Sequence, residues 1–168
     1  MQHMQGLARV IHGCDKSPAM LAANPADKCL LKQCDAYALP YADAQFELVY
    51  CWEFLHHIGD PRKVVGEMTR VASKAVLLCE PNCLNPAMAL FGILRSEERG
   101  LLRFTPSYTR KLLRAAGLRN IRCMTVGWFT PNRTPEWLAA AFVRLPYRVP
   151  VVGMYTMVLG YKDAAGPA

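Results

Sequence analysis

The sequence lacks the features that mark a secreted or membrane-spanning protein. No uncharged run reaches the ~20 residues that span a bilayer, and the run from Val149 to Tyr161 is interrupted by Pro150. No basic start followed by an apolar run and a small-residue cleavage site is present. These absences predict a cytoplasmic protein without a secretory signal or a transmembrane segment.

The sequence also lacks CxxC pairs, although it contains seven cysteines. An odd number of cysteines inside apolar runs predicts reduced thiols that act as small core residues. Those in apolar runs are Cys14, Cys29, Cys34, Cys51, Cys79 and Cys123. Cys79 and Cys83 have zinc-like spacing, but no His pair lies nearby in the sequence. The adjacent His56 and His57 are expected to point in different directions, so we expect no metal site.

Charge is unevenly distributed along a chain whose net charge is +7. Residues 1–83 carry eight Lys/Arg and nine Asp/Glu, whereas residues 84–168 carry twelve and four. The basic half could face an anionic substrate or an acidic membrane surface, or could form solvated helix faces. Because the basic residues form no dense block interleaved with aromatics, we expect no nucleic-acid partner.

The chain alternates short apolar runs with segments of helical period, which predicts an α/β fold with a mostly parallel sheet. At 168 residues and 52% hydrophobic content, it suits one domain over 1–162 with a short tail over 163–168. Strands are predicted at 9–14, 29–34, 46–51, 75–79, 120–129 and 154–161. Helices are predicted to begin after the caps Ser17, Asp60 and Thr105, and over about 135–144. Residues 82–104 are less regular.

Two predicted strands end in an aspartate, Asp15 and Asp35. Ligands of open α/β sheets bind outside the carboxyl ends of the strands, where an acid can accept hydrogen bonds from ribose hydroxyls. A second acid one strand away could accept a hydrogen bond from an adenine amino group. The pair therefore suggests an adenosine-shaped ligand, and the alternative is that both aspartates cap the following turn or helix.

Six short segments occur in an order that resembles the class I methyltransferases that use S-adenosylmethionine, in particular the small-molecule group that includes ubiquinone-pathway enzymes. The segments are Gly13–Met20, Asp35–Tyr41, Phe46–Val49, Leu55–Ile58, Glu67–Val71 and Glu80–Asn82. The resemblance is specific from about residue 9 to residue 82 and topological over 105–162. It implies a Rossmann-like three-layer sandwich with an antiparallel C-terminal strand.

The resemblance implies cofactor-binding roles for several positions. Asp15, beside Lys16, matches the acid that binds the ribose, and Asp35 matches the acid that receives the adenine amino group. The backbone amide of Ala36 would lie beside the adenine ring. The remaining matched positions, along the methionine part of the cofactor, are Cys51 and Trp52. Trp52 could instead be a core aromatic.

The resemblance places His57 near the point where cofactor and methyl acceptor meet. A base is needed only if the acceptor must lose a proton. The candidates for that base, in order, are His57, His56, Glu53 and Tyr108. The alternative for His57 is a histidine that only fixes the loop before the Asp60 helix.

One departure from the family concerns its glycine-rich loop. That loop follows the first strand, with the ribose-binding acid ~20 residues further on. Here the acid is Asp15, and no GxG occurs in the sequence. We therefore expect an incomplete methyltransferase domain without its first strand and glycine-rich loop. An in-frame strand and GxGxG upstream of Met1 would test this expectation.

The first strand of the family is central, between the strands predicted at 9–14 and 46–51. Since neighbouring strands lie ~4.8 Å apart, its absence would leave a slot ~9.6 Å wide lined by unpaired backbone groups. The chain could be a fragment, the flanking strands could close up, or a strand-donating partner or a second copy could fill the slot.

The first hypothesis is S-adenosylmethionine-dependent methyl transfer to a small-molecule or a lipid- or sugar-linked acceptor. Residues 83–104 could supply an apolar surface for this acceptor, or form an ordinary amphipathic helix. Their apolar residues are Met88, Leu90, Phe91, Ile93 and Leu94. The series Arg95, Arg99 and Arg103 could meet a phosphate or be a solvated face.

The alternative is a non-catalytic methyltransferase remnant or partner subunit, favoured by the missing loop and separable by calorimetric titration with the cofactor. A nicotinamide-dependent dehydrogenase shares the ribose-binding logic, but it gives no role to the segments from Asp35 to Pro40 and from Phe46 to Val49. Cofactor fluorescence would test it.

Overall fold

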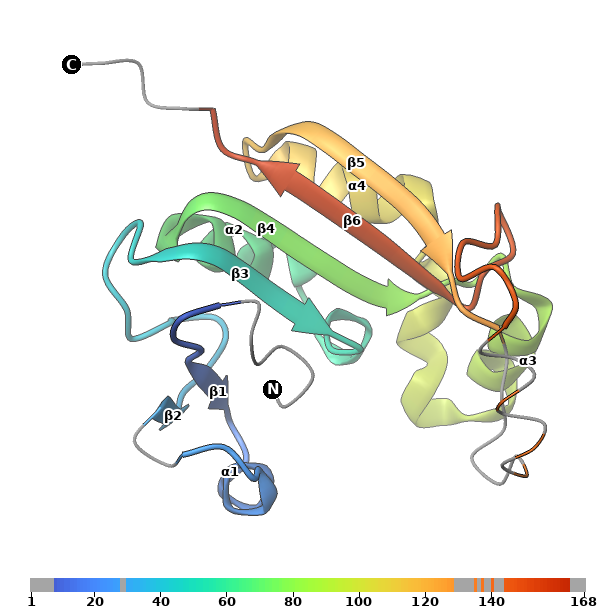
Figure 1. Cartoon of the computed structure of the whole chain (residues 1–168), viewed down its shortest axis with the longest axis horizontal. Helices are drawn as coiled ribbons and strands as arrows, with labels where there is room; N and C mark the ends of the chain where they lie inside the picture. The colour runs from blue at the N-terminus through green and yellow to red at the C-terminus, as the bar shows by residue number, and fades with distance from the viewer. Residues whose placement is uncertain are drawn as a thin grey trace. The chain divides into compact units, whose positions relative to one another are not determined.

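The structure is a computed structural model that describes residues 8–27, 30–128, 135, 137, 140 and 144–163. The chain divides into two compact units, residues 1–42 and residues 43–168. The single domain predicted over 1–162 stays a prediction. Figure 1 labels the helices and strands.

The first unit has a two-stranded parallel sheet of β1 (Gly13–Asp15) and β2 (Leu31–Gln33), with helix α1 (Pro18–Ala23) between them in sequence. Both strands are shorter than predicted. The Leu30 N–H donates to the Asp27 carbonyl (3.1 Å), and the pairing of β2 begins one residue later, at Leu31. Since β1 pairs only with β2 among the described residues, its pairing also begins late, at Gly13 opposite Leu31.

The second unit contains a four-stranded sheet in the order β3-β4-β6-β5 (Figure 1). Its strands are β3 (Phe46–Trp52), β4 (Ala72–Pro81), β5 (Arg119–Val126) and β6 (Tyr155–Tyr161). β3 and β4 are parallel, and β6 runs antiparallel to both β4 and β5. Three strands thus point one way, and a reversed C-terminal strand lies between two of them. The predicted α/β class with an antiparallel last strand is confirmed.

Strand β5 ends earlier than the predicted residue 129. Gly127 has φ of +80° and its N–H donates to the Tyr147 carbonyl (2.9 Å), so the backbone turns there. Such a left-handed conformation suits glycine and cannot continue a strand. Strand β4 is longer at both ends than the predicted 75–79.

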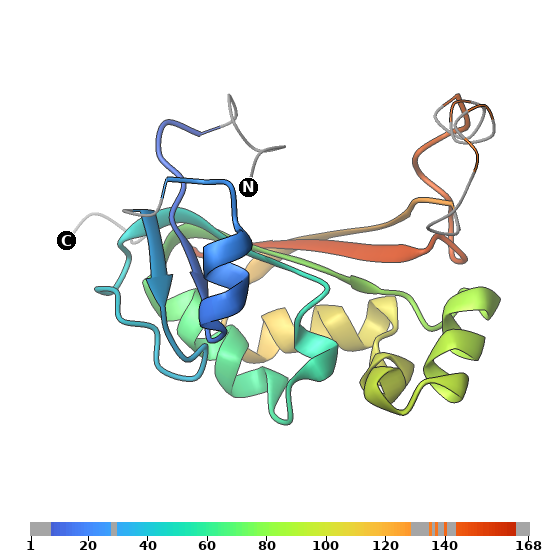
Figure 2. The ribbon, with the colours of Figure 1, turned by 90° about the horizontal axis from the view of Figure 1, so that it is seen from below.

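Helices α2 (Pro61–Val71) and α4 (Pro106–Ala115) lie on the same face of the four-stranded sheet (Figure 2). Their predicted starts are confirmed. The Asp60 side chain accepts from Arg62 N, and the Thr105 side chain accepts from Tyr108 N. The buried face of α2 is an apolar stripe at helical spacing, which gives the unit its core. That stripe consists of Val64, Val65, Met68 and Val71.

The segment predicted as irregular, residues 82–104, contains helix α3 (Pro86–Leu94) and the 3₁₀ helix η4 (Ser96–Arg103). Asn85 caps α3, because its Oδ1 accepts from Ala87 N (3.0 Å) and Met88 N (3.1 Å). A helix was only the alternative for this segment, because α3 is apolar on nearly every side and shows no 3.6-residue pattern.

Two predictions fall wholly or mostly outside the described residues: the helix over about 135–144 and the tail over 163–168. Among the described residues, no helix is both long and apolar enough to cross a membrane. Six cysteines are described, all as free thiols. Cys79 is buried in the core as predicted, but Cys14 is exposed, so the core role predicted for Cys14 is wrong.

Candidate functional site

The carboxyl ends of β1 and β2 place Asp15 and Asp35 after neighbouring strands of the first unit. Asp15 is the last residue of β1 and lies opposite Gln33, the last residue of β2. The Cys34 N–H donates to the Asp15 carbonyl (3.1 Å), which carries the pairing one residue further. Because the strands are parallel, both aspartates lie at the same edge of this sheet, where ligands of α/β folds bind.

The Asp15 carboxylate closes a turn. Its Oδ1 accepts a hydrogen bond from Ser17 N (2.8 Å), and Ser17 Oγ in turn accepts from Met20 N in α1 (3.3 Å). The capping role that sequence reasoning held as the alternative is therefore present. A carboxylate has two oxygens with several lone pairs, so this bond leaves capacity to accept from a ligand hydroxyl.

The Asp35 carboxylate also closes a turn and forms an ion pair. Its Oδ1 accepts from Tyr37 N (3.0 Å), and Lys16 Nζ lies 3.2 Å from its Oδ2. The hydrogen bond from the Tyr37 amide, and then the Lys16 ammonium, hold the pKa of Asp35 below its usual value. This carboxyl is therefore ionised at neutral pH and can accept a hydrogen bond from an amino group. Ala36 lies within the same turn, which the Ala38 N–H closes by donating to the Asp35 carbonyl (3.0 Å).

In the second unit, the end of β3 carries Cys51 and Trp52, followed by a strained residue, Glu53. Glu53 has a φ of +48°, a conformation rare for side chains of its kind, while its N–H donates to the Cys79 carbonyl (2.8 Å). Backbone strain of this type persists where surrounding structure enforces it, often at functional sites. Trp52 is half exposed, so the alternative that it is a core aromatic is wrong.

Tyr155, the first residue of β6, joins this strand end. Its Oη donates to Glu53 Oε1 (2.7 Å), and its ring centroid lies 5.6 Å from that of Trp52. Burial and then the Glu53 carboxylate raise the pKa of Tyr155, so the phenol keeps its proton at neutral pH. The three side chains place a carboxylate and two aromatic rings together. This arrangement suits a ligand with a cationic or aromatic part.

Behind this strand end, a buried carboxylate shapes the loop that follows β3. Glu80 is fully buried near the end of β4. Its Oε1 accepts from Phe54 N (3.1 Å) and Leu55 N (2.8 Å), and its Oε2 from His56 N (3.3 Å). Three consecutive amides thus converge on one side chain, which fixes the start of the 3₁₀ helix η3 (Leu55–His57).

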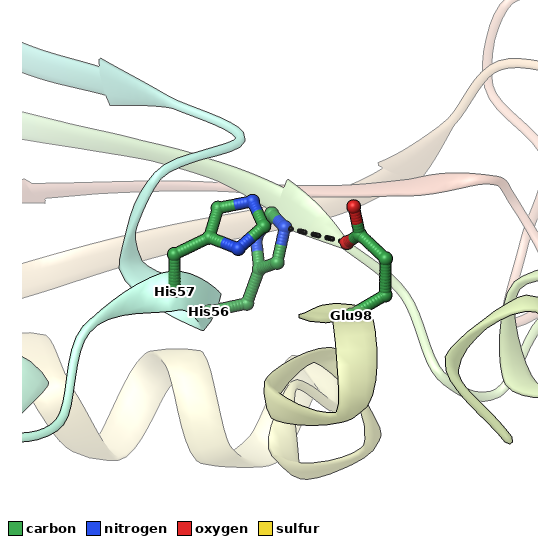
Figure 3. A group of neighbouring side chains, drawn as sticks. All are labelled: His56, His57 and Glu98. Atoms are coloured by element: carbon green, nitrogen blue, oxygen red, sulfur yellow. Dashed lines mark ion pairs between the residues drawn. The ribbon is translucent and has the colours of Figure 1, made fainter. Parts of the chain in front are cut away.

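His56 connects two carboxylates from different elements. Its Nδ1 lies 2.8 Å from Glu80 Oε2, and its Nε2 lies 3.3 Å from Glu98 Oε2 on η4. Figure 3 shows His56 and His57 on η3, with Glu98 reaching toward them from the opposite side. The His56 side chain is almost fully buried, so both ring nitrogens are committed to these contacts.

His57, the predicted catalytic residue, is exposed at the end of η3. Its ring centroid lies 3.9 Å from that of His56, so the two adjacent histidines do not point apart as expected. Its backbone N–H donates to the Phe54 carbonyl (3.1 Å), which fits the loop-fixing alternative as well. Its catalytic role stays a prediction, as do the cofactor roles of the residues above.

Sequence reasoning assigned no role to Glu80, Glu98 or Tyr155. Glu80 could have been found from its position, because it is an ionisable residue that directly ends a nearly apolar run of β4. Buried ionisable groups of this kind are rare unless they are paired. Glu98 and Tyr155 carry no such signal, since the chain separates them from their partners by many residues.

The base candidate Tyr108 lies in the first turn of α4. Its ring meets that of Phe104 edge-on, with the two ring centroids 5.2 Å apart.

Helix α3 presents an exposed apolar face. Its exposed apolar side chains are Leu90 (55% exposed), Phe91 (41%), Ile93 (61%) and Leu94 (72%). The opposite side of the helix packs on η4, where a Cβ at Gly92 would lie 2.8 Å from Leu101 Cδ1. Four of the five apolar residues predicted to form a surface within 83–104 are therefore exposed on α3, while Met88 is buried in the core.

Comparison with known proteins agrees with these features. Residues 1–79 match the family model of the methyltransferase domain. A rice protein (Oryza sativa subsp. japonica) named probable tocopherol O-methyltransferase, chloroplastic, is 31% identical over 130 residues, which are 68% of this chain and 34% of the relative. The chain thus spans about a third of the length of this curated relative.

The fold is shared with solved methyltransferase structures. An S-adenosylmethionine-dependent methyltransferase from Thermotoga maritima aligns with a TM-score of 0.73 at 14% identity, covering 90% of this chain and 72% of that one. One from Archaeoglobus fulgidus aligns with a TM-score of 0.63 at 11% identity, covering 89% and 75%. The fold is that of the class I S-adenosylmethionine-dependent methyltransferases. The family resemblance predicted from the sequence is confirmed.

Proposed function

We propose that this chain transfers a methyl group from S-adenosylmethionine to a small apolar or lipid-linked acceptor. The observation that carries the proposal is the pair of aspartates after β1 and β2, within the segment that matches the methyltransferase domain. Both aspartates lie at the carboxyl edge of a parallel strand pair, the edge at which ligands of α/β folds bind, and Asp35 is held ionised by Tyr37 and Lys16.

S-adenosylmethionine, when bound, supplies an electrophilic methyl group on a sulfonium sulfur. Asp15 would accept hydrogen bonds from the ribose hydroxyls, and Asp35 from the adenine amino group beside the Ala36 amide. Within the second unit, the exposed ring of Trp52, next to Cys51 in the sequence, offers a negative face that suits a cationic group. Positioning of this kind supplies most of the acceleration in an in-line displacement.

For an acceptor that must lose a proton, we propose Glu53 as the base. It directly follows β3 and is exposed, and its Oε1 is oriented by the Tyr155 hydroxyl. His56 is a poor candidate because both of its ring nitrogens already contact carboxylates. His57 is the second candidate, and the pH profile of a His57→Gln variant decides between them.

The apolar face of α3 supports an apolar acceptor. Four large apolar side chains of one short helix are exposed, an arrangement that is typical of a binding surface. The name of the rice relative indicates an acceptor of mixed aromatic and lipid character. A sugar-linked acceptor is the less favoured choice, because the exposed side chains Leu90, Phe91, Ile93 and Leu94 of α3 are all apolar.

Incubation of the purified chain with methyl-labelled S-adenosylmethionine and matched acceptors tests this proposal. The pair to compare is a phenol that carries an isoprenoid tail and the same phenol without the tail. We expect label transfer to the tailed phenol, and a Leu94→Ser variant should raise its KM while leaving that of the short phenol unchanged. Val10→Ser, an exposed apolar position in the other unit, is the control. Absence of transfer to either phenol would contradict the proposal.

A second candidate is a non-catalytic subunit of the same fold. The observation that favours it is that β1 and β3 belong to separate sheets, together with the absence of GxG from the sequence. In that case the partner would be a second copy or another chain that donates a strand. Light scattering of the purified chain, combined with the label-transfer assay, separates this candidate from the first.

A further inference from the structure

Three side chains outside the proposed cofactor contacts come together between η3 and η4. One ligand atom from each of His56, His57 and Glu98 lies within 4.8 Å of the others (Figure 3). The two histidines come from adjacent positions and the glutamate from a different element, so the fold and not the local sequence assembles the group. Imidazole nitrogens and a carboxylate oxygen are ligands of zinc and related divalent metals.

The hydrogen bonding of His56 determines what its second nitrogen can do. Glu80 already accepts three backbone N–H groups, so its carboxylate acts as an acceptor toward His56 Nδ1 at 2.8 Å. A neutral His56 then carries its proton on Nδ1 and a lone pair on Nε2. A carboxylate that holds the far nitrogen of a histidine in this way is the usual arrangement behind a metal-bound imidazole.

The lone pair on His56 Nε2 faces an oxygen of Glu98 across 3.3 Å. Two lone pairs at this separation repel unless a cation lies between them, and that cation is either a proton or a metal ion. Two ligands at 2.0–2.2 Å from a tetrahedral metal lie about 3.4 Å apart. The spacing between His56 and Glu98 therefore suits a shared metal ion as it stands.

The approach of η4 to η3 is enforced by the backbone. A Cβ at Gly100 would lie 1.7 Å from the His56 carbonyl oxygen, so only glycine permits the two elements to come this close. Arg103 Nη2 donates to the Ile58 carbonyl (3.1 Å) and ties the far end of η4 to the same loop. Glu98 is consequently held opposite His56 before any ligand arrives.

We propose that His56 Nε2, Glu98 and His57 bind one divalent metal ion of the zinc class. His57 is exposed and closes on the ion by a change of side-chain rotamer, and the fourth position is open to water. This site would connect η3 to η4. Zinc binding at this site does not require methyl transfer, because none of its three ligands is assigned to hold S-adenosylmethionine. It would make His57 a metal ligand and leave Glu53 as the proposed base.

Zinc titration of the chelator-treated full chain, with a chromophoric competitor, tests the site. We expect one high-affinity zinc per chain, and a loss of at least about tenfold in affinity for His57→Gln and for Glu98→Gln, since each removes a ligand. Both residues are at least partly accessible, so these variants should fold. His12→Gln and Glu97→Gln are matched controls that should bind zinc as the wild type does.

Cobalt(II) substitution separates this site from the cysteines. Visible bands without a thiolate charge-transfer band are expected for two imidazoles and a carboxylate. The inference is overturned if zinc does not bind stoichiometrically, if both site variants bind as tightly as the controls, or if a thiolate band appears. It is also overturned if nitrogen NMR finds both His56 nitrogens protonated in the presence of zinc, because a proton then occupies the gap.

Discussion

Glu80 shows how one side chain organises the residues around it. Its carboxylate is buried, and its described hydrogen bonds include none from Lys or Arg. The backbone amides of Phe54, Leu55 and His56 and the imidazole of His56 stabilise it instead. Hydrogen bonds to a charged group are the strong ones, and an acceptor lost from such a network leaves buried donors without partners.

Glu80→Gln is expected to lower the free energy of unfolding by about 3 kcal/mol. The amide keeps one acceptor oxygen, but its NH₂ group replaces the other and faces the donors of His56. Denaturant unfolding monitored by circular dichroism measures the change. Glu97→Gln, at an exposed neighbour of Glu98, should change the stability by less than ~1 kcal/mol. Equal effects for the two variants would contradict the network described here.

The Asp35 carboxyl is expected to titrate below the ordinary aspartate range, and Lys16→Ala should raise its pKa only part of the way back. The Tyr37 amide is the larger cause of the depression and remains in the variant. Because the folded pKa is lower than the unfolded one, the ionised group contributes stability above the unfolded pKa, and this is lost as pH falls through the folded pKa. Carboxyl-carbon NMR measures the titration, with Lys63→Ala as control. An unchanged pKa in Lys16→Ala would contradict the ion pair.

At the scale of elements, the starts of α2 and α4 were predictable because an N-cap residue precedes proline at each. The same signal stands at Asn85-Pro86, yet a helix there was only an alternative, since the apolar residues of α3 surround the helix. The lengths of β1 and β2 could not be read from apolar runs, because the two strands pair only over Gly13–Asp15 and Leu31–Gln33. Local signals fix where helices begin, whereas pairing between strands fixes how far a strand extends.

Gly100→Ala and Gly66→Ala are expected to act in opposite directions. At Gly100 the added methyl group meets the His56 carbonyl oxygen, so η4 must move away from η3 and the protein is destabilised. At Gly66, on the exposed side of α2, nothing lies within 4 Å of the added Cβ, and replacing a helical glycine gains about 0.5–1 kcal/mol. Thermal unfolding of both variants measures the difference. A Gly100→Ala protein as stable as the wild type would contradict the close approach of η3 and η4.

For the whole molecule, the sequence predicted the α/β class, the reversed last strand and the methyltransferase resemblance. The alternation of apolar runs with helical-period segments carried the α/β class. Six short segments in a fixed order carried the resemblance, which implied the reversed last strand. The Glu80–His56–Glu98 contacts and the Tyr155–Glu53 hydrogen bond could not be predicted. Each depends on side chains separated by 24 or more positions or placed by an unpredicted helix.

Calorimetric titration of the purified chain with S-adenosylmethionine bears most directly on the assignment of function. We expect saturable binding of one molecule per chain, weakened at least about tenfold by Asp15→Ala and by Asp35→Asn, since each removes hydrogen bonds to a charged acceptor. Circular dichroism first shows whether the chain is folded. If the folded chain then gives only the heat of dilution, at cofactor concentrations well above those needed by active enzymes of this fold, the proposed function is contradicted.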